Sequence, residues 1–497
     1  MKAVYIDSTI PEKEAKTRFC FPECIMMENA ASALEKAVKN AITAATENPL
    51  VLIVCGGGNN GADGIALSRR LKGSVECRVI LLSEPKTDEG KMQLKMAEAA
   101  GVSFISEKDL AALKTPDVIA DCIYGSGFHG SLNEPDAELI AKLNEFPSYK
   151  IACDIPSGIT KNGNAETIFR REKTAFKADE TVTMGALKLS LFTDDAKNFT
   201  GKITVAELGI SSAMFEKCAE PDAYLLNADD MVLPYRKKLS CHKGDFGHAA
   251  VILGEKAGAG IIAGTAALKT GSGFVTCVET KAVAKNFRMN PELMISESIP
   301  EKTTALLCGS GLGRNEENVH RIFNAFVKPY AENAKPAVIF DADAFYAPDF
   351  PEILRKLNDN PEAKVILTPH PKELQVLVNA LKLNENEIPL EEVVKNRFSY
   401  AKLFARNYKN IVLIAKGAVN YIVQGEKAFI TANGTPALAK AGSGDVLAGL
   451  CTGLLAQGYS ALEAAKTAVL AHGEASKTGK NNFSLTPIKL IANLEKL

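Results

Sequence analysis

The stretch VLIVCGGGNNGADGIALSRRLK (residues 51–72) joins an unbroken apolar run to a turn rich in glycine and asparagine, and a helical pattern follows. An apolar run without alternation is typical of a strand buried on both faces of a sheet. Glycines let a backbone approach a phosphate, and the amides that open a helix stabilise an anion. The spacing Gly56-x-Gly58-x-x-Gly61 matches a dinucleotide fingerprint, which is a common pattern by itself. The stretch therefore predicts a strand, a tight turn and a helix that could hold an anionic ligand.

The same alternation of short apolar runs and longer helical patterns continues along the whole chain. It gives LVLIVCGGG, CRVILLS, DVIADCIYG and KIACDIPSG in the first half, and AAVILG, ALLCGSGLG, AVIFDADA, KVILTPHP and IVLIAKG in the second. Such a pattern predicts an α/β protein whose parallel sheets carry helices on both faces. Ligands of these sheets bind beyond the carboxyl ends of the strands. The segment SSAMFEKCAEPDAY (211–224) separates the halves, so we expect two different domains, 1–212 and 225–497.

Composition narrows the class of protein. The chain has 497 residues, 46% of them hydrophobic, and a formal net charge of -1. A near-neutral charge does not indicate a nucleic-acid or membrane-surface partner. No apolar run approaches the roughly 20 residues of a membrane span. The polar start of the chain does not resemble a signal peptide, and none of the eleven cysteines forms a CxxC pair. We expect a cytoplasmic globular protein with reduced, buried cysteines.

Oxygen-bearing side chains gather at three predicted strand ends in the first half. Asn59, Asn60 and Asp63 share the opening turn, and a helix cap would explain only one of them. Asp121 and Asp154 each follow or close an apolar run. A buried aspartate without a partner is costly, so these residues are expected to meet a cation or a polar ligand.

A metal site is one way to satisfy these oxygens. Asn60, Asp121 and Ser157 are hard oxygen donors that could share one ion. Because the set holds a single carboxylate, it suits a monovalent cation better than Mg²⁺.

The motifs of the first half resemble those of the YjeF-type N-terminal domain family, the NAD(P)HX epimerases. The motifs are MENAA (27–31), CGGGNNGADG (55–64), DCIYGSGFHG (121–130), DIPSG (154–158) and ADETVTMGALK (178–188). The resemblance spans about residues 1–212. It implies a three-layer Rossmann-like αβα fold and interconversion of the R and S forms of hydrated NADH or NADPH. Two departures are Ala62 and Ala31, which stand where the family usually has glycine.

The resemblance also implies site residues. It places K⁺ at Asn60, Asp121 and Ser157, and it makes Asp154 the acid or base near the hydroxylated ring carbon, with Lys188 as a second candidate. The hydrated dinucleotide would contact Asn59, Asn60, Gly61, Ala62, Asp63, Gly125, Ser126, Gly127, Phe128, His129, Gly130, Ser131 and Asp154.

The second half carries its chemistry in AGSGDVLAG (441–449). Gly442 and Gly444 precede Asp445, which begins an apolar helical pattern. The amides of that first turn could hold phosphate oxygens while Asp445 accepts a proton from a substrate hydroxyl, although Asp445 could also be only a helix cap. His370 lies between two prolines at a strand end, where ligand contact is expected. Small residues in 255–275 predict a tightly packed helix, with ligand contact as the alternative.

Two further aspartates, Asp341 and Asp343, end a predicted strand. They could hold Mg²⁺ on a nucleotide or cap the next turn.

The second half resembles the ribokinase-like superfamily, and within it the NAD(P)H-hydrate dehydratases. The motifs are GSGLG (309–313), DADA (341–344), LTPHPKE (367–373) and AGSGDVLAG. The match covers about residues 225–497 and implies a ribokinase-like αβα fold. It implies contacts with the (6S)-hydrate at Ala259, Gly311, His370 and Asp445. It implies nucleotide contacts at Lys416, Gly417, Ala418, Val419, Asn420 and Gly444, with Asn420 standing where the family more often has threonine.

Together the two resemblances imply a bifunctional repair enzyme for damaged nicotinamide cofactors. The first domain would convert (R)- to (S)-NAD(P)HX, and the second would dehydrate the S form. The implied substrates are NADHX, NADPHX and ADP with Mg²⁺, and a homo-oligomer is expected. Three other classes stay open: an ATP-dependent small-molecule kinase, a nicotinamide oxidoreductase, and a nucleotide sensor without activity. The oxidoreductase is disfavoured because the ribose-binding acid is not clear, Glu84 being the nearest strand-end carboxylate.

Overall fold

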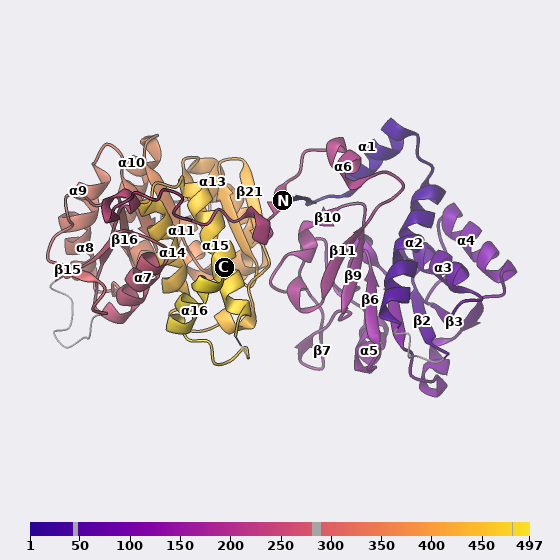
Figure 1. The fold of residues 1–497 in the computed structure, drawn as a ribbon. Coiled ribbons are helices and arrows are strands. Elements are labelled where there is room, and N and C mark those ends of the chain that lie inside the picture. The colour runs from indigo at the N-terminus through magenta and orange to yellow at the C-terminus, as the bar shows by residue number, and fades with distance from the viewer. Residues whose placement is uncertain (43–47, 281–289, 480) are drawn as a thin grey trace. The chain divides into compact units, whose positions relative to one another are not determined.

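The computed structural model describes residues 1–42, 48–280, 290–479 and 481–497. The chain forms two compact units, one of Lys2–Ala223 and one of Tyr224–Leu497 with Met1. Figure 1 shows the elements of each unit. No helix among these described ranges is long and apolar enough to cross a membrane.

The N-terminal unit is built on a sheet of parallel strands in the order β11-β9-β6-β5-β2-β3-β4. The strands are β2 (Leu50–Cys55), β3 (Glu76–Leu81), β4 (Ser103–Ile105), β5 (Val118–Cys122), β6 (Tyr149–Cys153), β9 (Glu180–Met184) and β11 (Lys202–Ala206). Shorter strands of the unit are β1 (Lys2–Tyr5), β7 (Ile168–Phe169), β8 (Glu172–Lys173) and β10 (Leu187–Lys188).

Helices cover both faces of this sheet. Val51 and Ile53 of β2 pack with α2 (Glu23–Ala41), α3 (Asn59–Leu71) and α4 (Asp88–Ala99), whereas Leu52 and Val54 pack with α5 (Glu134–Glu145). The alternation follows from the pleat, which sends successive side chains to opposite faces. The unit also contains α1 (Thr9–Phe19) and α6 (Ser212–Phe215). The predicted three-layer Rossmann-like arrangement is confirmed.

The C-terminal unit has a larger sheet, in the order β12-β21-β20-β19-β18-β17-β16-β13-β14-β15. The strands are β12 (Ala223–Leu225), β13 (His248–Ile252), β14 (Phe274–Val278), β15 (Met294–Ser296), β16 (Ala305–Cys308), β17 (Ala337–Phe340), β18 (Lys364–Leu367), β19 (Ile411–Ala415), β20 (Asn420–Gln424) and β21 (Lys427–Thr431).

One strand of this sheet corrects the expectation of purely parallel sheets. β20 is antiparallel to both β19 and β21. The connections that flank β20 are too short for the crossover that a parallel pair requires, so the chain makes hairpins there.

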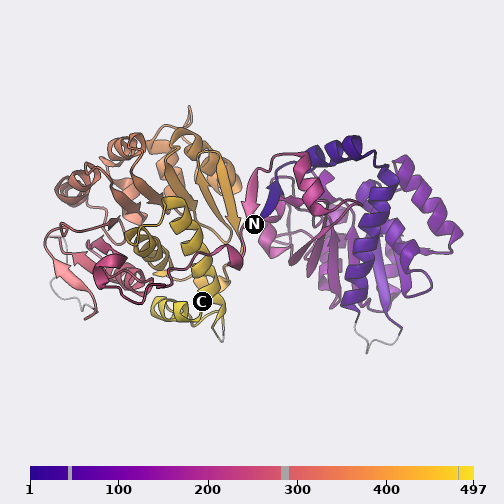
Figure 2. The ribbon, with the colours of Figure 1, turned by 45° about the horizontal axis from the view of Figure 1, so that its top comes forward.

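Helices also cover both faces of the second sheet (Figures 1 and 2). Ile339 of β17 belongs to the core under α7 (Ala257–Lys269), α14 (Ser443–Ala456), α15 (Ala461–Lys477) and α16 (Pro487–Asn493). The next residue, Phe340, packs edge to face on Phe350 of α10, with ring centroids 5.0 Å apart. The other helices are α8 (Glu316–Ile322), α9 (Lys328–Ala331), α10 (Phe350–Asp359), α11 (Pro371–Ala380), α12 (Leu390–Lys395) and α13 (Arg397–Asn407).

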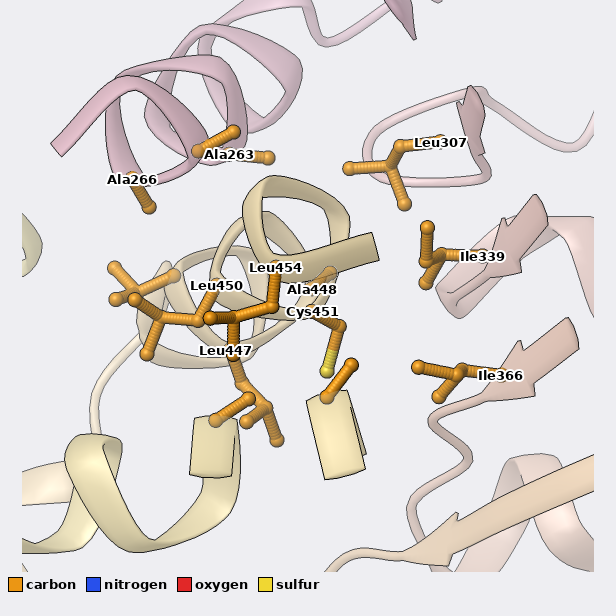
Figure 3. Packing of buried hydrophobic residues seen from close by; sticks show 14 of the residues in the cluster. Ala263, Ala266, Leu307, Ile339, Ile366, Leu447, Ala448, Leu450, Cys451 and Leu454 are labelled. Atoms are coloured by element: carbon orange, nitrogen blue, oxygen red, sulfur yellow. The ribbon is translucent and has the colours of Figure 1, made fainter. Parts of the chain in front are cut away.

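The helices α7 and α14 approach each other closely because small residues face one another. A Cβ added at Gly449 would lie 2.2 Å from the carbonyl oxygen of Ala263 and 2.7 Å from the Cβ of Ala266. Figure 3 shows Ala263 and Ala266 on one side of α14 and Ile339 of the sheet on its other side. The predicted tightly packed helix is confirmed, and this packing places the first turns of both helices side by side.

Candidate active sites

The opening turn of the N-terminal unit is held by a close backbone contact. The N–H of Gly56 donates to the carbonyl of Cys122 on β5, over 3.0 Å. A Cβ added at Gly61 would lie 1.8 Å from the carbonyl oxygen of Gly56, so only glycine lets α3 begin so near the end of β2. Ala62 is fully buried within α3 and is not among the residues of positive φ, so the alanine is compatible with the turn. Ala31 is likewise fully buried, within α2.

A buried oxygen cluster lies where β5 and β6 end. The carboxylate of Asp121, which is 0% exposed, accepts hydrogen bonds from the N–H and the hydroxyl of Ser157, at 2.8 and 2.7 Å. It also accepts from the N–H of Ile123 at 3.1 Å. Burial raises the pKa of Asp121 to about 6, against the lowering effect of these hydrogen bonds. The side-chain amide of Asn60, in its hydrogen-bonded orientation, donates to the backbone carbonyl of Cys153 at 3.1 Å. Its oxygen accepts from the N–H of Gly125 at 3.3 Å.

Asp154 occupies a strained and well-bonded position after β6. Its φ of 68° is left-handed, which is costly for a residue with a Cβ and is typical of functional sites. The ammonium of Lys188 lies 2.6 Å from one carboxylate oxygen. The backbone amides of Met184 and Ser126 donate to the carboxylate at 3.1 and 3.2 Å, and the hydroxyl of Thr183 lies 3.3 Å away. Burial raises the pKa of Asp154, but Lys188 and these donors outweigh it and the net pKa is lowered.

A cavity of about 490 Å³ opens over these residues. Of the residues singled out in the sequence, Asn59, Asn60, Asp63, Ser126, Gly127 and Asp154 line it. Its other wall comes from α1 and α2, with Glu12, Lys13, Lys16, Glu23 and Met26 among the lining side chains. Apart from Met27 and Ala30 of the MENAA motif, this wall was not predicted from the sequence, because helices remote from the glycine turn supply it.

Several predicted contacts lie outside the cavity lining. Gly61 and Ala62 are buried inside α3, and Phe128 is in the core, with its ring centroid 5.0 Å from that of Tyr124. His129, Gly130 and Ser131 are exposed and do not line the cavity.

In the C-terminal unit, the glycines after β16 form the first part of a second site. Gly311 has a φ of 65°. A Cβ there would lie 2.4 Å from the carbonyl oxygen of Lys256 and 2.9 Å from the Cβ of Ala259. The structure therefore brings together Ala259 and Gly311, which the sequence analysis assigned to the same ligand.

A buried cluster of charged side chains connects the ends of β17 and β19 with the start of α11. The ammonium of Lys416, after β19, lies 2.9 Å from Asp341, after β17, and 3.9 Å from Glu373 on α11. The hydroxyls of Thr368 and Ser310 also donate to Asp341, at 2.7 and 3.2 Å. Burial lowers the pKa of Lys416, but the neighbouring carboxylates outweigh it and the net pKa is raised, so this ammonium stays charged.

His370 and Glu373 form a capping box at the start of α11. The N–H of His370 donates to Glu373 at 2.8 Å, and the N–H of Glu373 donates to the His370 ring at 3.3 Å. Burial raises the pKa of Glu373 to about 7. The sequence analysis missed Glu373, although a glutamate three residues after a cap position is the capping-box signal.

Asp445 lies in the first turn of α14, after Gly442, whose φ is 91°. A Cβ at the neighbouring Gly444 would lie 3.5 Å from the ammonium of Lys416, so this turn and the ion pair are adjacent. Burial raises the pKa of Asp445 to about 6, helped by the charge of Asp341. A proton-accepting carboxylate, a cation and open helix amides therefore meet at one place.

The predicted magnesium ligands are engaged by protein groups. Asp343 accepts from the N–H of Gly313 at 3.0 Å and from Arg314 at 3.2 Å, while Asp341 pairs with Lys416. Across the described ranges, no group of three or more His, Cys, Asp or Glu residues is arranged to hold a metal.

The predicted nucleotide segment, 416–420, forms the turn between β19 and β20. The N–H of Lys416 donates to Pro369 at 2.9 Å, and the side chain of Asn420 accepts from the N–H of Gly417 at 3.3 Å. The guanidinium of Arg397 fills the space beside Gly417, where a Cβ would lie 2.3 Å from it, and donates to the carbonyl of Val419 at 2.6 Å. Arg397 was missed from the sequence, because it lies on α13.

Two family descriptions match the chain. Residues 23–190 match the YjeF-related protein N-terminus, and residues 249–496 match the NAD(P)H-hydrate dehydratase family.

Two curated relatives match across both units of the chain. The bifunctional NAD(P)H-hydrate repair enzyme Nnr of Helicobacter pylori is 39% identical, over 100% of both chains. The Escherichia coli enzyme of the same name is 28% identical, over 86% of this chain and 80% of that protein. Among solved structures, the ADP/ATP-dependent NAD(P)H-hydrate dehydratase of Bacillus subtilis, co-crystallised with ATP and Mg²⁺, covers 55% of this chain and 97% of its own, with a TM-score of 0.44 and 24% identity. By its full-length identity, this chain belongs to the family of bifunctional NAD(P)H-hydrate repair enzymes.

Proposed function

We propose that the N-terminal unit converts (R)-NAD(P)HX to the S form and that the C-terminal unit dehydrates the S form with ADP. The observation that carries this division of labour is that each unit has its own candidate catalytic carboxylate, buried in the case of Asp154 and partly buried in the case of Asp445. Asp154 faces the cavity of the first unit, and Asp445 opens α14 of the second. Each carboxylate has a lysine nearby that favours its ionised form: Lys188 pairs with Asp154, and Lys416 partly offsets the effect of burial on the pKa of Asp445.

In the N-terminal unit, Asp154 is the base and Lys188 keeps it ionised. Asn60, Asp121 and Ser157 would hold K⁺. The donor set fits a monovalent cation, since it offers oxygens with one carboxylate, and among the described residues no cationic side chain bonds to Asp121. A bound cation supplies positive charge that stabilises the ionised form of this buried carboxylate, whose pKa is raised to about 6 because burial outweighs the hydrogen bonds that it accepts.

In the C-terminal unit, Asp445 takes the proton of the ring hydroxyl as that oxygen attacks the terminal phosphoryl group of ADP. The amides that open α14 and the ammonium of Lys416 stabilise the charge on the phosphoryl oxygens. Phosphate then leaves with the C–O bonding pair. The lone pair of the ring nitrogen assists this departure, and loss of a ring proton restores the double bond. AMP is released as the second product. Hydroxide is a poor leaving group, and phosphorylation of the hydroxyl replaces it with a good one.

The aspartates considered for Mg²⁺ already have protein partners. Asp341 and Asp343 already pair with Lys416 and Arg314, so the described residues do not form a protein-built Mg²⁺ site. Magnesium would accompany the phosphates of the nucleotide.

The test is to incubate the whole protein with a mixture of NADHX epimers, with ADP or ATP, in K⁺ buffer or in buffer with a large organic cation. Complete conversion to NADH with ADP and K⁺, with release of phosphate, is the expected result. Conversion of the S form alone in K⁺ buffer would contradict the epimerase assignment. A stable phosphorylated product in place of NADH would identify a small-molecule kinase.

A further inference from the structure

We propose that Asp63 is a second catalytic residue of the N-terminal unit, which protonates the ring hydroxyl while Asp154 accepts a proton from water. This inference rests on the proposed epimerase function and adds a general acid to it. Asp63 comes from α3 and Asp154 from the end of β6, and both line the same cavity.

The two carboxyl groups have opposite surroundings. Asp154 is bonded by Lys188 and by several N–H and O–H donors, as described above. In the described part of the chain, the carboxyl of Asp63 has one hydrogen bond, a long one with the thiol of Cys153 at 3.9 Å. No cationic side chain within the described ranges pairs with it, and the residue is only 9% exposed. A carboxylate so placed is costly when ionised, so the protonated form is favoured.

The surrounding charges act in the same direction. Burial raises the pKa of Asp63 well above its usual range, and the negative charges of Asp154, Glu12 and Glu23 raise it further. When the surroundings of two neighbouring carboxyl groups push their pKa values apart, the group with the higher pKa can act as an acid and the other as a base. Asp63 therefore has the proton to donate, and Asp154 has the free electron pair.

A structural role does not explain Asp63. The cap position of α3 is Gly58, and Asp63 lies beyond the first turn, so it is not a helix cap. Its helical neighbours Ala62, Ile65 and Ala66 are fully buried apolar residues. An alanine or leucine would suit this environment better than an acid whose one hydrogen-bond partner, among the residues that the structure describes, is the thiol of Cys153.

The chemistry of the proposal balances. Asp63 gives its proton to the C6 hydroxyl, the C6–O bond breaks, and its electron pair leaves with water. The ring nitrogen donates its lone pair to form an iminium ion. Water then adds to the opposite face of C6 and passes a proton to Asp154, so the substrate is inverted with no net gain of atoms. Proton exchange with solvent resets the two carboxyl groups, and the reverse reaction uses them in exchanged roles.

The decisive variant is Asp63→Asn, which keeps the shape and removes the proton donor. The rate at which the R epimer disappears, measured by separating the two epimers, should fall by at least about 100-fold, the scale of general acid catalysis. The same variant should dehydrate purified S epimer with ADP at the wild-type rate. This rate serves as the control for folding and for protein concentration. Asp88→Asn is the matched control, because it makes the same substitution at an exposed position of α4. An Asp63→Asn rate equal to wild type overturns the inference.

A second measurement uses the wild-type protein and so does not depend on how the variant folds. In water enriched in heavy oxygen, the S epimer formed should carry the label on its C6 hydroxyl, because the original oxygen leaves. Epimerisation without incorporation of the label overturns the inference. Absence of epimerase activity in the wild type would instead overturn the proposed function, so the two failures are distinguishable.

Discussion

At the residue scale, both sites use residues that the fold holds in costly conformations. Asp154 and Ala342 each have a left-handed backbone although neither is glycine; Asp154 directly follows β6, and Ala342 is the second residue after β17. Ala342 follows Asp341, which pairs with Lys416. Strain of this kind persists only where the surrounding structure enforces it, so part of the stability of each unit is given up to aim these side chains.

Replacement of Asp445 by asparagine should remove dehydration and leave the rest intact. The amide cannot accept the hydroxyl proton, so the rate should fall by about 10²–10⁴-fold. Binding of ADP, measured by calorimetry, should persist, because the amides of α14 and Lys416 remain. Dehydration of the S epimer at the wild-type rate would contradict the assignment of Asp445 as base.

The dehydration rate should depend on pH through the same residue. Burial raises the pKa of Asp445 to about 6, and only the ionised form accepts a proton. We expect kcat/KM to rise as the pH is raised through about 6 and then to level off. A rate that is constant between pH 5 and pH 8 on this scale would argue against a carboxylate base.

Loss of the lysine beside Asp154 should cost stability and shift a titration. Lys188→Met leaves a buried charge without its partner, a change that typically costs about 3–5 kcal/mol. The lowered pKa of Asp154 means that this pair stabilises the fold above the usual value of 3.8 and that the contribution is lost as the pH falls through the lowered pKa of the folded state. Urea unfolding at pH 7 should show the loss in the variant, and the difference from wild type should shrink at pH 3. A difference that does not change with pH would contradict the ion-pair explanation.

At the element scale, the sequence predicted the strands and turns well. It predicted less well which side chains from other helices pack against them. The apolar runs predicted strands such as β2, β6 and β17, because burial on both faces leaves a continuous hydrophobic pattern. Glu373, Arg397 and the α1 wall of the cavity were missed. These residues reach the sites through packing between distant segments, and local patterns do not encode such contacts. Lys416 and Asp341 were each singled out, but their pairing is visible only when neighbouring strands are aligned.

The contact between α7 and α14 gives a test at this scale. Gly449→Ala places a methyl group 2.2 Å from the carbonyl oxygen of Ala263, so the helices must separate, at a cost of about 1–3 kcal/mol. Gly258→Ala on α7 is the control, because nothing lies within 4 Å of its added Cβ and its φ is not left-handed. Thermal unfolding should show a lower transition for the first variant alone. Equal transitions would mean that the glycine is not needed for the packing.

At the scale of the whole molecule, two sites in one chain serve one damaged cofactor. The dehydratase is expected to consume only the S form, so the epimerase decides whether half or all of a mixture is recovered. In both cases the candidate carboxylate and the lysine near it belong to one unit: Asp154 and Lys188 to Lys2–Ala223, and Asp445 and Lys416 to Tyr224–Leu497.

Complementation between two inactive chains would test this independence. Asp154→Asn should retain dehydration, and Asp445→Asn should retain epimerisation. Each alone should fail to repair an epimer mixture completely, and a mixture of the two proteins should restore full recovery of NADH, followed by its absorbance. A mixture that stalls at the recovery given by Asp154→Asn alone would show that the two activities must reside in the same chain.

The contact of Gly61 with the backbone of Gly56 has a consequence for how this turn can change over generations. No side chain, however small, fits at position 61, whereas position 62 already carries a methyl group without distortion. Of these two adjacent positions, only 62 can accept substitutions without moving the backbone. Sequence variation among related turns is therefore expected at position 62 and not at position 61.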